Sequence, residues 1–86
     1  MNPLGADPSD FAEQIGALEV DGLLLSACST FLTVGQAKVE RGELAEAKKA
    51  IDAAVTLLPQ LAEEARRALE PAVAELQVAY ATAASG

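Results

Sequence analysis

Apolar residues recur every three or four positions along most of this chain, which is the spacing of amphipathic helices. The stretch from Gly22 to about Glu40 differs, because its first half is apolar nearly all round. The apolar side chains of that half are Leu23, Leu24, Leu25, Ala27, Cys28, Phe31, Leu32 and Val34. A helix with apolar residues on every side is normally buried on every side. We therefore predict a helix over this stretch whose first half lies inside the fold or against a partner.

Two further helices follow, each with one apolar stripe. The first runs from Glu43 to about Leu58, after Arg41-Gly42, a basic residue and a glycine that together favour a helix end. Its inner stripe comprises Leu44, Ala47, Ile51, Ala54, Val55 and Leu58. The second begins at Pro59, which we place in the first turn because proline needs no N–H there; one kinked helix through Pro59 is the alternative. Its stripe comprises Leu61, Ala65, Ala68, Leu69, Ala72, Val73, Leu76 and Tyr80, and the proline at position 71 should bend it.

The two ends of the chain complete the predicted architecture. Residues 1–7 are interrupted by proline and glycine and predict a disordered lead-in. We expect a short helix from Pro8 to Leu18, Asp21 as the cap of the helix that follows, and fraying over 84–86. No segment alternates apolar and polar residues with a period of two, so we expect no sheet. The sequence thus predicts one all-α domain over 8–83, a small bundle of three main helices plus a short N-terminal one, built on an antiparallel helical hairpin.

A second pattern lies within the predicted hairpin. It begins with a bulky aromatic, Phe31, followed by the pair Val34-Gly35. At fixed spacing there follow an alanine, Ala47, a bulky residue, Ile51, and a closing proline, Pro59. In this the segment resembles one tetratricopeptide repeat, although Lys38 stands where that family has an aromatic. One repeat length further along, Leu69 replaces Gly35, so no second repeat follows. The resemblance implies paired helices in which small residues allow close approach and large ones fill the gap.

The chain from about Gly22 to Tyr80 carries another set of short motifs. An uncharged apolar helix precedes Leu44-Ala45-Glu46-Ala47-Lys48, Ile51-Asp52, Glu75-Leu76 and Ala79-Tyr80. In these residues the chain resembles a family of small bacterial helical proteins known only as a domain of unknown function. That resemblance implies a helical fold and supplies no catalytic residue to match.

Composition excludes most kinds of chemistry. The 86 residues hold 13 acidic and 6 basic side chains, no histidine and one cysteine, for a net charge of −7. Phosphate binding needs clustered Lys and Arg, so we expect no nucleic-acid partner. Without histidine, the usual general base and metal ligand is missing, and one cysteine forms neither an internal disulfide nor a thiolate metal site. We therefore expect no metal, no cofactor, no catalytic residue and no enzymatic activity.

The charge pattern also bears on location. The uncharged stretch from Gly22 to Ala37 is shorter than the roughly 17–25 apolar residues that a membrane-spanning helix needs, and it contains serines and threonines. The first residues lack the positive and apolar regions of a signal peptide. We expect no membrane partner and a cytoplasmic protein.

These inferences favour a non-catalytic interaction or assembly module that self-associates, with a dimer as the first expectation. Only two other long helices are available to cover the apolar helix, and each uncovered leucine forgoes roughly 1.5–3 kcal/mol of burial. We predict that Leu24, Cys28, Phe31 and Leu32 contact a second copy. The alternatives are a small binder of an apolar ligand in a helical cleft, and a regulatory adaptor bound to a larger enzyme.

Overall fold

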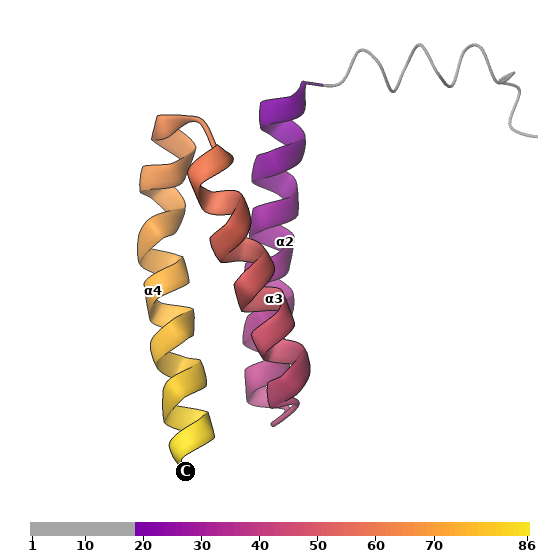
Figure 1. The fold of residues 1–86 in the computed structure, drawn as a ribbon, viewed down its shortest axis with the longest axis vertical. Coiled ribbons are helices and arrows are strands. Elements are labelled where there is room, and N and C mark those ends of the chain that lie inside the picture. The colour runs from indigo at the N-terminus through magenta and orange to yellow at the C-terminus, as the bar shows by residue number, and fades with distance from the viewer. Residues whose placement is uncertain (1–18) are drawn as a thin grey trace, which may run out of the picture.

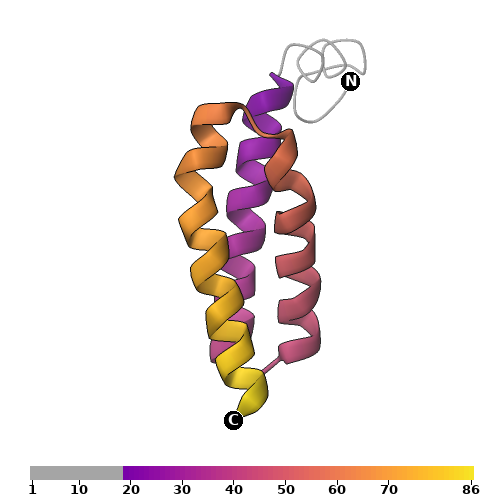
Figure 2. The same ribbon diagram turned by 60° about the vertical axis from the view of Figure 1, so that its left-hand side comes forward.

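The computed structural model describes residues 19–86, which form three α-helices joined by two short connections (Figure 1). The helices are α2 (Val20–Glu40), α3 (Leu44–Leu57) and α4 (Glu63–Ser85), and a 3-10 turn, η1 (Leu58–Gln60), precedes the last. Successive helices run antiparallel, and α3 and α4 both lie on the same side of α2 in Figure 1, whereas the view of Figure 2 shows α2 behind and between them. No strand occurs between residues 19 and 86. The prediction of an all-α fold with three main helices is confirmed, whereas the expected lead-in and the expected helix over 8–18 lie outside the described residues.

Helix α2 begins two residues before the predicted start. Its N-cap is Glu19, whose backbone carbonyl accepts the hydrogen bond from the Leu23 N–H at 3.1 Å. Asp21 lies inside the first turn, so the prediction that it caps the helix was wrong. An acid in the first turn still interacts favourably with the positive end of the helix dipole. Asp21 therefore marks the start of the helix to within a few residues, although it is not the cap.

The connection between α2 and α3 is a glycine-terminated helix end, as the sequence predicted. Gly42 has a φ of 74°, in the left-handed region that side chains disfavour. Its N–H donates to the Val39 carbonyl at 3.0 Å, and the Glu43 N–H donates to the Lys38 carbonyl at 2.9 Å. This pair of bonds is the Schellman motif, which satisfies carbonyls that the end of a helix leaves free. The motif turns the chain directly into α3.

Pro59 lies in η1 and not in the first turn of α4, so that prediction was wrong. Here its missing N–H again carries no cost, because the first residues of a 3-10 turn also lack a partner. The chain then becomes extended at Leu61 (φ −73°, ψ 152°), whose side chain is buried, and α4 begins at Glu63. Helices α3 and α4 are therefore separate, which rejects the alternative of one kinked helix. Helix α4 itself continues through Pro71 without interruption.

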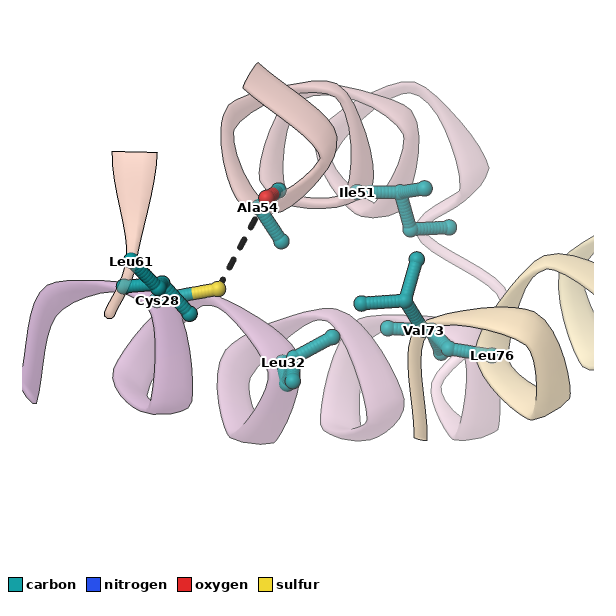
Figure 3. Packing of buried hydrophobic residues seen from close by; sticks show 7 residues of the cluster. All are labelled: Cys28, Leu32, Ile51, Ala54, Leu61, Val73 and Leu76. Carbon is teal, nitrogen blue, oxygen red and sulfur yellow. Dashed lines mark hydrogen bonds between the residues drawn. The ribbon is translucent and has the colours of Figure 1, made fainter. Parts of the chain in front are cut away.

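The core lies where the three helices meet (Figure 3). Its buried members are Cys28, Leu32, Ile51, Ala54, Leu61, Val73 and Leu76. Close approach depends on small residues: a Cβ added at Gly35 would lie 2.9 Å from Leu76 Cδ2 and 3.5 Å from the Cβ of Ala50. Because a methyl group at this position would overlap an already packed leucine, glycine allows α2 to approach both partners at one level of the bundle.

Candidate functional site

The four residues predicted to contact a second copy do not share one face of α2. Cys28 is fully buried and Leu32 is 9% exposed, and both belong to the core (Figure 3). Leu24 is half-buried and packs against that core, whereas Phe31 is 38% exposed. Of the four, only Phe31 is placed to meet a partner. The sequence could not separate them, because a helix that is apolar all round does not reveal which side its neighbours will cover.

A row of apolar side chains remains open along another side of α2. We call it the outer stripe, and its members are Val20, Leu23, Ala27, Phe31 and Val34. Its four larger side chains are between 38% and 67% exposed, and its alanine is half-buried. The spacings of three and four residues place all five on one side of a helix with 3.6 residues per turn. Four large apolar groups in a row form a continuous patch rather than the scattered exposure that is ordinary on a protein surface.

The remaining side of α2 is largely polar apart from Leu25, which is 38% exposed, and two of its hydroxyl groups are occupied locally. The Thr30 hydroxyl donates to the Ser26 carbonyl at 2.8 Å, and the Thr33 hydroxyl donates to the Ser29 carbonyl at 3.0 Å. This return bonding to the preceding turn is the ordinary role of such residues within a helix. Within the part of the chain that the structure describes, neither hydroxyl is hydrogen-bonded to a side chain that could act as a general base.

Charged residues stand at the two ends of α2 and are missing between them. Glu19 and Asp21 lie at its start. At its other end, Lys38 Nζ lies 3.4 Å from Glu43 Oε1, and Arg41 Nε donates to the other carboxylate oxygen of Glu43. The hydrogen bond from Arg41 is the main reason why the pKa of Glu43 lies below its usual range. The outer stripe is therefore an uncharged surface. At one end of it lie Glu19 and Asp21, and at the other end Lys38 and Arg41 share the carboxylate of Glu43.

The other candidate groups have structural surroundings. Burial raises the pKa of the Cys28 thiol, and its Sγ lies 3.6 Å from the Ala54 carbonyl oxygen, which is a contact of a neutral thiol. The basic residues of α4 form exposed ion pairs one turn apart, Arg66 with Glu70 and Arg67 with Glu63. Each such pair contributes a few tenths of a kcal/mol. Within residues 19–86 no three potential ligand side chains gather to hold a metal ion.

A second surface feature is a shallow groove between α2 and α4. It encloses about 330 Å³ and is lined by Leu32, Thr33, Gln36, Ala72, Glu75 and Leu76. Its floor is apolar, because the two leucines belong to the core. Its rim is polar, with a single carboxylate. The groove is separate from the outer stripe, which lies on another side of α2.

By length and composition, α2 also resembles a helix that crosses a membrane. It has 21 residues and a mean hydropathy of 1.2 over its most apolar part. A core helix of a soluble protein has the same length and composition, so this resemblance is weak evidence. It does underline how little of the helix its own bundle covers, since only 11% of that part is buried.

Comparison of the chain with known protein families, with curated proteins and with solved structures finds no match. The site must therefore be interpreted from its own geometry. Of the four contacts predicted from the sequence only Phe31 belongs to the outer stripe, and the other four stripe residues were not among them. The signal that could have found them is the three-and-four spacing of Val20, Leu23, Phe31 and Val34, which is visible once Cys28 is taken to face inward.

Proposed function

We propose that this protein is a non-catalytic helical module that self-associates, as a dimer, through the outer stripe of α2. The observation that carries the proposal is the exposure of four large apolar side chains in one row on α2, whose residues 22–37 include no charged side chain. Full burial of such a side chain is worth roughly 1.5–3 kcal/mol, and these four are still between 38% and 67% exposed, so covering all four would gain a part of that figure at each position. The sum is large compared with the stability of a small domain. A second copy of the chain carries the same apolar stripe, and a two-fold interface pairs the same patch of both chains.

Electrostatics supports a contact at the stripe rather than elsewhere. Each copy carries a net charge of −7, so two copies repel over most of their surface. None of the stripe residues is charged. Between Val20 and Val34 the one charged residue is Asp21, and it lies on a different side of the helix. A contact along the stripe therefore buries apolar area without bringing like charges into the interface. The acidic remainder of the surface maintains solubility and discourages further association.

Sedimentation velocity of the full chain over a range of concentrations tests the proposal. We expect a dimer for the unchanged protein and a monomer for Val34→Asp, because the new carboxylate would have to be desolvated in the contact. Circular dichroism should show that the variant stays helical, since the side chain of Val34 is 41% exposed and not part of the core.

Val78→Asp is the matched control. Val78 is also an exposed valine, on the outer face of α4, and the same change there should leave the dimer intact. An unchanged protein that stays monomeric at all concentrations contradicts the proposal, and so does a Val34→Asp variant that remains dimeric. A monomer that binds phosphatidylcholine vesicles through α2 would assign the stripe to a lipid surface instead and would also contradict it.

The groove between α2 and α4 favours a second candidate function, the binding of a small apolar ligand. The supporting observation is its apolar floor of Leu32 and Leu76, with a volume of about 330 Å³. Mass spectrometry under native conditions tests this by detecting a bound apolar molecule. Ala72→Trp should fill the groove and remove that molecule. A protein that carries no ligand from its host and binds no added fatty acid would contradict it.

A further inference from the structure

The outer stripe is symmetric about its own centre. Ala27 is its middle member, Leu23 and Phe31 lie four residues to either side, and Val20 and Val34 lie seven residues to either side. The smallest side chain thus stands at the centre, where two crossing helices approach most closely. Reversing the direction of the stripe leaves large apolar groups at the same distances from that alanine. A row of this kind matches a second copy of itself in either direction.

We infer that two copies pair their α2 helices in the antiparallel direction, about a two-fold axis at Ala27. This inference rests on the proposed self-association and specifies its geometry. The axis places Val20 against Val34 of the partner subunit and Leu23 against Phe31 of the partner subunit. Each large side chain then has an apolar neighbour of the other copy, and the two alanines face each other. The contact is isologous, so it closes at two copies.

The charges at the ends of α2 select this direction over the parallel one. Glu19 forms no ion pair within residues 19–86, whereas Lys38 and Arg41 share the single carboxylate of Glu43. A parallel pair would place the two acidic starts side by side, and it would place Lys38 and Arg41 of one copy beside the same two cations of the other copy. The antiparallel pair brings Lys38 within about one helical turn of Glu19 of the partner subunit.

Two further features agree with the antiparallel direction. The Glu40 carboxylate accepts a hydrogen bond from Gln36, and both lie on the polar side of α2, away from the contact. It therefore does not cancel the positive charge that Lys38 presents there. The dipoles of two helices also attract when the helices run in opposite directions and repel when they run in the same direction.

Disulfide cross-linking of single-cysteine chains tests the direction. Cys28→Ala removes the native thiol, and Val20→Cys or Val34→Cys is then introduced, with one of the two chains carrying a mass tag. Oxidation of the mixed chains should produce a disulfide-linked dimer that joins one chain of each kind. Either chain oxidised alone should give at least tenfold less. Val78→Cys, on the outer face of α4, is the control and should give only background.

The possible results distinguish a failure of the antiparallel direction from a failure of the proposed self-association. Efficient cross-linking of Val20→Cys with itself would show a parallel pair and overturn the inference. A dimeric protein in which no stripe cysteine cross-links would overturn pairing through the stripe while leaving self-association in place. An unchanged protein that sediments as a monomer would overturn both.

Discussion

At the scale of single residues, the identity of side chains on α2 divides the helix into a buried, a polar and an apolar open side. Cys28 occupies the most enclosed position, where its small volume and weak polarity suit contact with the backbone of α3. Gly35, one turn beyond Leu32, occupies the position of closest approach. Both positions tolerate little change in volume, since the interior is packed like a crystal. The exposed stripe residues carry no such restriction within a single chain.

Gly35→Val should destabilise the fold, in contrast to a glycine substitution elsewhere on the same helix. A Cβ at this position lies 2.9 Å from Leu76 Cδ2, and Leu76 is itself buried, so the Leu76 side chain or the helix that carries it must shift. Overpacking of this kind lowers the free energy of unfolding by about 1–3 kcal/mol. Urea unfolding, followed by circular dichroism at one protein concentration, measures the change.

Gly22→Ala is the matched control, because nothing lies within 4 Å of a Cβ at that position. Removing a helical glycine there should raise the free energy of unfolding by about 0.5 kcal/mol. Equal effects of the two substitutions would mean that the close approach at Gly35 does not determine the packing of the bundle.

At the scale of elements, the connections decide where each helix stops. The first connection was predictable because its signals are local: a basic residue, then a glycine whose positive φ closes two hydrogen bonds. The second was predictable only in part, because proline is equally suited to the start of a 3-10 turn and to the start of an α-helix. Burial of Leu61 against the core decides between them, and that contact involves residues far away in the sequence.

Gly42→Ala should weaken the first connection. The left-handed conformation at φ 74° costs an L residue with a Cβ about 1–2 kcal/mol. We expect a corresponding loss of unfolding free energy without loss of helix content. Gly42→Asn should cost less, since asparagine adopts this conformation more readily. Equal losses for both variants would show that strain at φ is not the cause.

At the scale of the whole molecule, α3 and α4 cover one side of α2 (Figure 1), and another side stays exposed. A chain of this size has a thin margin of stability, and four exposed large apolar groups on one helix add nothing to it in isolation. The acidic surface and the paired charges of α3 and α4 are consistent with ordinary solvated faces. The open side of α2 is thus the surface through which we propose that two copies associate.

Chelation should leave the stability of the whole molecule unchanged. The chain has no histidine and a single cysteine, which is buried. Because no ligand set gathers within residues 19–86, we expect no metal to bind the folded state preferentially and contribute to its stability. Thermal unfolding followed by circular dichroism, with and without EDTA, should give the same melting temperature. A decrease of more than about 5 °C on adding EDTA would reveal a metal site and contradict the exclusion.

The sequence by itself determined the helical fold class, the approximate limits of α2 and α3, and the glycine-terminated end of α2. These follow from periodicity and from local capping chemistry, which act over a few residues. Only the tertiary structure decided that Cys28 and Leu32 face inward while Val20, Leu23 and Val34 face outward. It also decided that α3 and α4 are separated by η1. The physical reason is that a nearly uniform apolar helix has no preferred direction of its own. Which of its sides becomes the core depends on where α3 and α4 pack, and small residues such as Gly35 determine that packing.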